Sequence, residues 1–409
     1  NMKIINKIAI LISWPREIDM FSSFTENILD DVVFIVDDFF YYTQDEKHEN
    51  AKNIVELLND EMDYVLLSKV LGKLKYKILL STAQTLQEKV TYGSYLKYIY
   101  AIYIGSFIYD SGLSEFFMKK TGHSLTGGGK DARKFGRYHI EKVIGKKVIK
   151  YPKGLDISKT NYPDKKWKNI FDVYFCHSKI DHGLITNKFS DAKCINIGYP
   201  RYDRILPIKC AKKNIFSEIH GINILKPTLL WMSTLIRFKG ELTDNIGVWA
   251  PTIIKLLDEF NIIIRPHPKV VVIDPEIVNN LTELGFLVDV KKNRNLGELY
   301  QSVDLVLADY GGSVLSSVYM KKKLILLNMS SEYTHMRKKR MYIDDDVRRY
   351  VRSFNIDNRL ALVEQVKNDI KDNNKLKIER LKKIFFGDEC DHENIKQLSY
   401  GLVKELAAD

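Results

Sequence analysis

The segment 309–313 carries the strongest chemical signal in the 409-residue chain. It reads Asp309-Tyr310-Gly311-Gly312-Ser313, follows an apolar run at 304–308 and opens a segment with helical periodicity. Glycines let the backbone approach an anion closely, the first amides of a helix have no intrahelical acceptor, and the Ser313 hydroxyl adds a donor. The pattern predicts a phosphate-binding loop made of Asp309, Gly311, Gly312 and Ser313. An ordinary helix N-cap with a tight turn is the alternative.

A second candidate is the turn Arg265-Pro266-His267-Pro268, which directly follows an apolar run at 261–265. Two prolines restrict the backbone and set the direction of the imidazole between them. Arg265 beside His267 suits a diphosphate, to which the imidazole could donate a hydrogen bond or, as imidazolium, offer positive charge. A solvated histidine in a turn is the alternative.

Ser233 ends a third predicted strand, at 228–233, and Thr234 and Arg237 follow it. Their hydroxyls and guanidinium group are suited to phosphate oxygens. This signal is weak alone. Three strand ends with anion-binding residue types in one half of the chain together predict the phosphate site of a nucleotide-activated donor.

The N-terminal half contains an unusual segment at 122–130, which begins Gly122-His123 and ends Gly129-Lys130. We expect His123 to be a general base for an acceptor hydroxyl and Lys130 to contact phosphate. A basic surface loop without a catalytic role is the alternative. The glycines do not form a nucleoside-triphosphate loop, because no predicted strand precedes them and Asp131 stands where Ser or Thr is required.

No metal or other cofactor is expected, because the sequence has no Asp-x-Asp, no His-Glu-x-x-His and no acidic pair at metal-ligand spacing near these strand ends.

We interpret the run 344–346, three aspartates, as a helix cap on a solvated face. The four cysteines are scattered, which argues against a zinc site and against a disulfide framework and fits a reducing cytoplasm.

Apolar runs alternate with amphipathic segments through the C-terminal half, which is typical of βαβ units. Strands are expected at 228–233, 261–265, 286–290, 304–308 and 323–327, with helices at 249–260, 275–284, 296–302 and 313–321. The N-terminal half repeats the rhythm less clearly, with strands at 8–13, 32–36, 64–67, 77–80 and 171–176. This predicts an α/β fold of two Rossmann-like domains, whose ligands lie beyond the carboxyl ends of the strands.

The expected division is an N-terminal acceptor domain at 1–207, a C-terminal nucleotide-donor domain at 208–390 and a last helix within 391–409 that packs back on the first domain. A linker is expected near 207–226. The first apolar run is interpreted as a strand and not as a signal peptide, because no small-residue cleavage site follows it. No stretch reaches the roughly 20 apolar residues of a membrane span.

The chain carries a formal net charge of +11, which indicates an anionic partner such as a phosphorylated substrate, an anionic lipid or a nucleic acid. A basic module that binds nucleic acid or lipid without catalysis is one alternative. The 63 lysines and arginines are spread along the chain, and no aromatic-basic RNA motif is present, so no nucleic-acid partner is expected.

The region from Phe171 to Gln397 resembles the CDP-glycerol glycerophosphotransferase family of teichoic-acid and capsule polymer enzymes. The resemblance rests on the segment 198–204, which matches the family pattern Gly-x-Pro-Arg-x-Asp, on the Arg-Pro-His-Pro turn at 265–268, on 302–304, and on the loop 309–313. It implies a GT-B fold with two Rossmann-like domains facing a central cleft. It also implies that His267 and the loop contact the donor pyrophosphate and that an N-terminal histidine, here His123, is the base. Arg201, the arginine of the first motif, is expected to contact acceptor or phosphate.

From the resemblance we expect transfer of an alditol phosphate from a CDP-linked donor to an anionic polymer or a lipid-linked acceptor. The expected location is cytoplasmic, peripheral on the inner face of the bacterial plasma membrane. The nearest alternative is a GT-B glycosyltransferase that uses a CMP- or UDP-activated sugar for capsule or lipopolysaccharide, because strand-end phosphate sites look alike whichever group is transferred.

Overall fold

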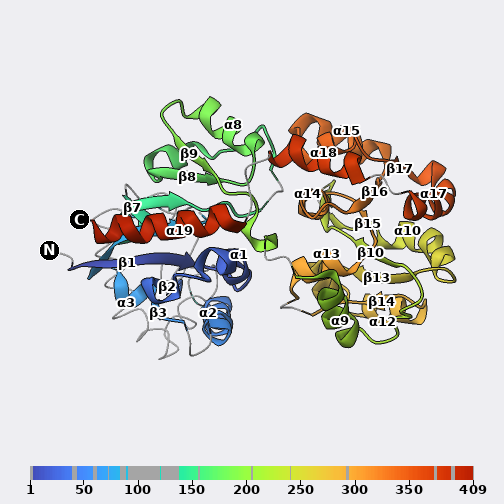
Figure 1. Ribbon diagram of the computed structural model, residues 1–409, viewed down its shortest axis with the longest axis horizontal. Helices are drawn as coiled ribbons and strands as arrows, with labels where there is room; N and C mark the ends of the chain where they lie inside the picture. Colours follow the sequence, from blue (N-terminus) through green and yellow to red (C-terminus); the bar gives the residue numbers. More distant parts are fainter. Residues whose placement is uncertain are drawn as a thin grey trace.

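The computed structural model describes residues 3–38, 44–58, 62–71, 73–82, 89–90, 120, 138–154, 157–203, 206–239, 241–291, 294–372, 375–387 and 392–408. Two parallel β-sheets, each covered by helices on both faces, lie side by side (Figure 1). The expected α/β fold with two Rossmann-like units is therefore confirmed.

The N-terminal sheet has seven strands in the order β3-β2-β1-β4-β7-β8-β9, and all its neighbouring strands are parallel. Their bounds are β1 Lys3–Ile12, β2 Val32–Val36, β3 Tyr64–Leu66, β4 Leu74–Ser81, β7 Gly145–Lys150, β8 Val173–Cys176 and β9 Lys193–Asn196. The chain adds strands outward from β1 on one side and from β4 on the other. The topological switch point, where such sheets bind ligands, therefore lies between β1 and β4.

The C-terminal sheet has six strands in the order β14-β13-β10-β15-β16-β17, again parallel throughout. Their bounds are β10 Thr228–Met232, β13 Asn261–Arg265, β14 Leu287–Val288, β15 Leu305–Ala308, β16 Lys323–Leu327 and β17 Ser353–Phe354. Its switch point lies between β10 and β15. Two small antiparallel pairs accompany the sheets: β5 Lys89–Val90 with β6 Tyr138–His139, and β11 Ile236–Phe238 with β12 Glu241–Thr243.

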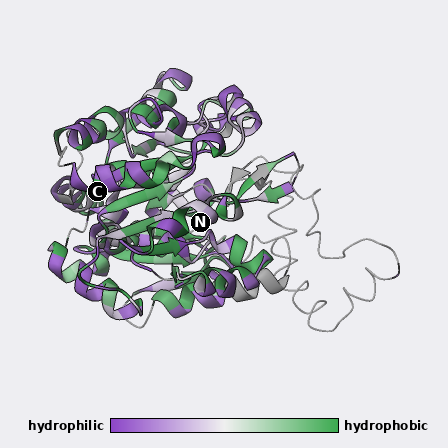
Figure 2. Ribbon diagram, turned by 90° about the vertical axis from the view of Figure 1, so that its right-hand side faces the viewer, coloured by the Kyte–Doolittle hydropathy of each residue, from purple (hydrophilic) through white to green (hydrophobic). Residues whose placement is uncertain are grey.

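Alternation along β1 shows why these strands are buried on both faces. Ile8, Ile10 and Ile12 pack with the helices of one face, whereas Ala9 and Leu11 pack with those of the other. Such strands are continuously apolar, as parallel sheets between two helix layers require. Figure 2 shows the apolar strands inside, with the polar sides of the helices outward.

In the N-terminal half, α1 Arg16–Thr25, α2 Gln44–Leu58 and α19 His392–Ala407 cover one face of the sheet, and α3 Leu67–Val70, α7 Ile140–Ile144 and α8 Lys179–Lys188 cover the other. In the C-terminal half, α10 Ile246–Ile253, α11 Pro268–Ile273, α12 Glu276–Glu283 and α17 Ala361–Lys371 cover one face. The opposite face carries α9 Ile208–Glu218, α13 Leu296–Ser302, α14 Gly312–Tyr319, α16 Ile343–Val347 and α18 Lys375–Phe386. Helix α15 Ser331–Arg340 lies beside the loop that follows β15. Short 3-10 turns are η1 Leu29–Asp31, η4 Lys165–Asn169, η5 Pro200–Tyr202, η6 Ile254–Leu256 and η7 Ile356–Asn358.

The last helix, α19, packs against β1 and α1 of the N-terminal half (Figure 1). The Ser399 hydroxyl donates to the Phe24 carbonyl at 2.8 Å, and Lys77 Nζ donates to the Leu406 carbonyl at 3.0 Å. The C-terminal end of the chain thus packs on the N-terminal half, although the preceding residues form the C-terminal sheet and its helices. The domain boundary at 207/208 stays a prediction, although α9 begins at Ile208.

The turn η5 joins the two halves at the edge where their strands end. Arg201 of η5 forms an ion pair with Asp19 of α1. The Tyr202 ring packs on Tyr300 of α13 with centroids 5.7 Å apart. Asp203 accepts a hydrogen bond from the Tyr319 hydroxyl of α14. One short motif therefore contacts the first helix of the first half and two helices of the second.

Some segments differ from the sequence-based expectation. The expected linker at 207–226 contains α9, which packs against α13 and so belongs to the second half. The strands β7 and β9 and the β11–β12 hairpin were not predicted. Their sequences are short or rich in lysine and asparagine, and they form strands because neighbouring strands supply the hydrogen bonds.

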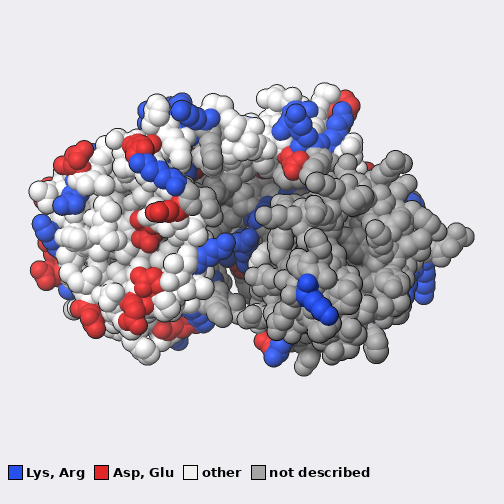
Figure 3. All heavy atoms as spheres, turned by 180° about the vertical axis from the view of Figure 1, so that it is seen from behind, with Lys and Arg blue, Asp and Glu red and all other residues white. Residues whose placement is uncertain are grey.

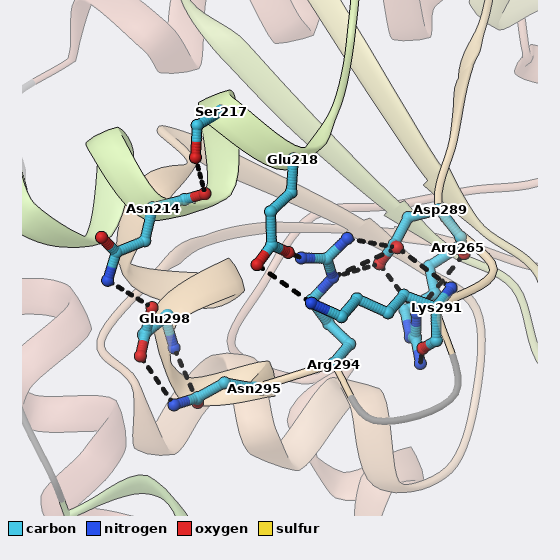
Figure 4. Close-up of polar contacts among 9 residues, drawn as sticks. All are labelled: Asn214, Ser217, Glu218, Arg265, Asp289, Lys291, Arg294, Asn295 and Glu298. Carbon is cyan, nitrogen blue, oxygen red and sulfur yellow. Dashed lines mark hydrogen bonds and ion pairs between the residues drawn. The ribbon is translucent and has the colours of Figure 1, made fainter.

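A cluster of charged side chains lies beside β14, at the edge of the second sheet (Figure 4). Asp289, whose side chain is 2% exposed, accepts from Arg265 at 2.7 Å and from Arg294 at 2.8 Å. Arg294 also pairs with Glu218 of α9. The carboxylate therefore neutralises the buried Arg294 and the partly buried Arg265, and it links three segments.

We expect Asp289→Asn to lower the free energy of unfolding by about 3 kcal/mol, because the buried Arg294 and the partly buried Arg265 lose their shared anion, while Arg294 keeps only Glu218. Urea denaturation measures the change. Glu332→Gln is the control: it breaks the solvent-exposed pair with Lys239 and should cost less than about 1 kcal/mol. Equal effects of the two substitutions would contradict the role given to Asp289.

Candidate functional site

The loops after β10 and β15 lie side by side because these strands are neighbours in the sheet, with Met232 opposite Ala308. The Thr234 backbone N–H donates to Asp309 Oδ2 at 3.1 Å, and the Thr234 hydroxyl donates to the Tyr310 carbonyl at 2.9 Å. The structure therefore brings together two of the three predicted strand ends through direct hydrogen bonds.

Asp309 is a buried carboxylate at this junction. Its side chain accepts the Thr234 N–H on one oxygen and the Tyr310 N–H, at 2.7 Å, on the other. Burial raises the pKa of Asp309 to about 7, although these hydrogen bonds favour the ionised form. Its charge therefore changes near neutral pH.

Gly311 adopts φ +77° and ψ −147°, a conformation that is essentially restricted to glycine. Its N–H donates to Asp344 Oδ2 at 2.9 Å. Asp344 is fully buried and ion-paired with Arg337 at 2.6 Å. The interpretation of the 344–346 run as a solvated face is thus wrong for Asp344, because the folded chain uses this carboxylate to hold the Gly311 amide.

The amides that remain for an anion are therefore those of the first turn of α14. Helix geometry leaves the N–H groups of Gly312, Ser313 and Val314 without an intrahelical acceptor. The Ser313 hydroxyl already donates to the Tyr310 carbonyl at 3.3 Å, so its expected donor role is taken within the loop. Of the predicted loop residues, Gly311 therefore has its amide engaged within the protein, whereas the amides of Gly312 and Ser313 remain candidates for an anion.

Two arginines not singled out from the sequence support this loop. The Tyr310 ring lies between the guanidinium groups of Arg337, 4.6 Å from the ring centroid, and Arg348, at 4.2 Å. Arg348 also donates to the Asp309 carbonyl. The basic runs at 337–340 and 348–349, on either side of the three aspartates, contain these arginines, but only the fold shows which basic side chains contact the loop.

The Ser233 hydroxyl lies at the same switch point and is buried without a hydrogen-bond partner among the described residues. An unpaired buried hydroxyl is costly, so such groups in native structures need an explanation. A bound phosphate oxygen would supply the missing acceptor.

His267 follows β13, the neighbour of β10 on its other side. Its Nδ1 accepts the Lys269 N–H at 3.2 Å, which places the ring proton on Nε2. Burial, and then the positive charges of Lys269 and Arg16, lower the pKa of His267. The ring is therefore neutral at pH 7 and offers an Nε2–H donor, which favours the hydrogen-bond alternative over imidazolium.

The other predicted residues are placed elsewhere or are not described. Arg265 pairs with Asp289 and donates to the Lys291 carbonyl at 3.0 Å (Figure 4). Arg201 is engaged by Asp19. Arg237 lies in β11, and its side chain is not described. His123 and Lys130 lie outside the described residues.

Neither a metal-binding cluster nor a membrane-spanning helix is found in the described part of the chain. No group of three or more His, Cys, Asp or Glu side chains there could hold a metal ion. Each helix there falls short of the length and apolar character that a membrane crossing requires.

Two parallel sheets with strand-end sites at their switch points define a GT-B-type fold. A family model described as CDP-Glycerol:Poly(glycerophosphate) glycerophosphotransferase matches residues 145–391. The chain belongs to this family and is a transferase of the CDP-glycerol glycerophosphotransferase type. No curated protein matches it in sequence.

Solved structures show the same fold. The chain is similar to the wall teichoic acid polymerase TagF, with 11% identity and a TM-score of 0.58 over 99% of this chain and 90% of that one. A TagF H444N structure soaked with CDPG gives 10% identity and 0.57 over the same shares. A UDP-N-acetylglucosamine 2-epimerase gives 9% identity and 0.52 over 100% of this chain and 98% of that one.

We expect Gly311→Ala to lower the free energy of unfolding by about 1–3 kcal/mol, because alanine does not tolerate this backbone conformation. Gly312→Ala is the matched control: a Cβ at Gly312 meets no atom within 4 Å, and stability should stay within about 1 kcal/mol. Thermal denaturation followed by circular dichroism compares the two. Loss of stability in Gly312→Ala alone would contradict the loop geometry described here.

Proposed function

We propose that the chain transfers an alditol phosphate, glycerol phosphate in the simplest case, from a CDP-linked donor to the hydroxyl end of a teichoic-acid-like or capsule polymer. The observation that carries the proposal is the arrangement at the ends of β13, β10 and β15. There, the His267 imidazole, the unpaired Ser233 hydroxyl and the first amides of α14 follow three adjacent strands. Neutral donors in this arrangement suit a diphosphate.

In the proposed reaction an acceptor hydroxyl oxygen attacks the phosphorus that carries the alditol. The new phosphorus–oxygen bond forms as the bond to the CMP phosphate breaks, and CMP leaves with the electron pair. The hydroxyl proton passes to a general base, for which we propose His123 on the basis of its motif. Most of the rate would come from positioning and from stabilisation of charge on the phosphate oxygens.

Each residue proposed to contact the diphosphate of the CDP-linked substrate has its own role. His267 would donate from Nε2 to the leaving phosphate without itself changing charge, since Nδ1 is held by the Lys269 amide. Ser233 and the α14 amides would bind the other oxygens, and Arg237 would add positive charge. No metal ion is part of the proposal, because these donors and the Arg237 charge would together stabilise the diphosphate oxygens.

We further propose that the enzyme works at the inner face of the membrane, where a lipid-linked acceptor would be presented. The +11 net charge supports attraction to anionic lipid. In sedimentation assays, we expect the protein to bind phosphatidylglycerol vesicles at low salt, to be released at high salt, and to bind phosphatidylcholine vesicles weakly. Absence of binding to either vesicle would contradict the membrane location.

Calorimetric titration with CDP-glycerol, CDP-ribitol, CMP, UDP and UDP-sugars tests the donor. We expect cytidine-selective binding that weakens about tenfold or more in His267→Ala, since a hydrogen bond to a charged phosphate is lost. The control is His335→Ala, an exposed histidine on α15 that should leave affinity unchanged. Selectivity for uridine nucleotides would favour the glycosyltransferase alternative, and absence of nucleotide binding would refute both.

The same titration at pH 6 and pH 8 tests the electrostatics of the site. Because the pKa of Asp309 is about 7, a proton neutralises this carboxyl at pH 6, whereas at pH 8 its charge repels the diphosphate. We therefore expect tighter CDP-glycerol binding at pH 6. Tighter binding at pH 8 would show that Asp309 does not act on the bound donor.

A further inference from the structure

The N-terminal sheet has its own switch point, between β1 and β4. β1 ends at Ile12 and β7 ends at Lys150, on either side of β4. The chain after β1 carries Arg16 at the start of α1, and the chain after β7 carries Lys153. Both cations therefore lie where an open α/β sheet binds its ligand.

The two segments are held together rigidly beneath these side chains. The Glu17 carboxylate is fully buried and accepts the Ser13 N–H at 2.6 Å, the Trp14 N–H at 2.9 Å and the Thr82 hydroxyl. The loop after β1 is thus tied to the end of β4.

Tyr151 ties the segment after β7 to the same place. Its N–H donates to the Ser81 carbonyl at 2.8 Å, its hydroxyl donates to the Met20 carbonyl at 3.1 Å, and its ring packs on Phe21 with centroids 4.2 Å apart. Arg16 and Lys153 therefore project from a preformed platform.

These cations lie close to one another and to the donor site. Partial desolvation of the ammonium group, and then the charge of Arg16, lower the pKa of Lys153 to about 8, and Arg16 also contributes to lowering the pKa of His267 in the other half. Arg16 and Lys153 are exposed, and neither forms an ion pair within the described residues. Glu17 is the acidic group whose charge acts on Lys153, and both of its carboxylate oxygens already accept hydrogen bonds within the platform. Two neighbouring positive charges without an acidic partner attract an external anion.

Figure 3 shows lysine and arginine atoms gathered beside the hollow between the two halves. Positive charge beside this hollow favours the binding of an anion there.

We propose that Arg16 and Lys153 bind the phosphate of the terminal unit of the acceptor. This inference rests on the proposed function. In a poly(glycerol phosphate) end, three carbon atoms separate the attacking hydroxyl from the oxygen of its own phosphodiester. A hydroxyl placed at the donor phosphorus near His267 therefore brings a second phosphate close by. The donor diphosphate has its own groups in the C-terminal half, whereas Arg16 and Lys153 belong to the opposite sheet.

The two side chains suit this task in different ways. The Arg16 guanidinium can bind two phosphate oxygens at once, and the Lys153 ammonium adds a point charge. The pair would select acceptors that end in a phosphorylated alditol over uncharged ones and would hold the hydroxyl in line for attack.

Binding of a short, synthetic glycerol phosphate oligomer is measured by calorimetry without nucleotide, at constant ionic strength, for Arg16→Gln and Lys153→Gln. We expect each to weaken binding about fivefold or more. The controls Lys213→Gln on α9 and Arg359→Gln after η7 remove the same charge from exposed positions elsewhere and should change binding less than about twofold. CDP-glycerol affinity should be unchanged in all four variants.

Transfer kinetics give a second readout. With the oligomer as acceptor, we expect Arg16→Gln and Lys153→Gln to raise KM with little change in kcat, and with a phosphate-free glycerol ether acceptor to change neither. Nuclear magnetic resonance titration of His267 should show a higher pKa in Arg16→Gln than in the wild type, whereas Arg359→Gln should leave it unchanged.

Three results would overturn the inference: equal weakening in the control variants, a matching loss of CDP-glycerol affinity, or equal losses with the phosphate-free acceptor. Failure of the wild-type protein to bind CDP-glycerol would instead contradict the proposed function, so the two failures are distinguishable.

Discussion

The hydrogen bonds that join Thr234 to Asp309 and to the Tyr310 carbonyl are the contacts on which the rest of the site depends. They set the distance between the loops after β10 and β15, and thereby the position where α14 begins. The Asp344 carboxylate then holds Gly311 in its glycine-only conformation, and the free amides of α14 face the space beyond the sheet. A change in the contact between Thr234 and Asp309 would therefore also move Gly311 and the start of α14.

Burial of charge is the constraint that these contacts must satisfy. Asp309 accepts two amide N–H groups, Asp344 pairs with Arg337, and Tyr310 lies between Arg337 and Arg348. The two carboxylates under the loop thus have partners inside the protein, which favours a single arrangement of the loop. Ser233, by contrast, has an unpaired hydroxyl, and it lies where a donor phosphate is proposed to bind.

The two sheets share one structural feature at their switch points. Each has a buried carboxylate at its switch point, Asp309 in one and Glu17 in the other, that organises loop amides. The turn η5 and the last helix, α19, connect the two halves of the chain, so the two sites belong to sheets that are linked by direct contacts. Nucleotide chemistry is proposed at one and acceptor recognition at the other, which would let a transferase bring two anions together without using the same cations for both.

The sequence by itself determined the fold class and the strand ends of the C-terminal half, because β10, β13, β15 and β16 are short apolar runs that alternate with amphipathic segments, a pattern typical of βαβ units. It also determined that Ser233, His267 and the loop 309–313 follow strands, since this depends on chain order alone. Only the tertiary structure decided which groups are free. Whether the Gly311 amide, the Arg265 guanidinium or the Asp344 carboxylate is available depends on partners 24 to 33 residues away, which no local pattern encodes. The platform under Arg16 and Lys153 was likewise hidden from the sequence, because strands separated by more than a hundred residues bring its parts together through long-range packing.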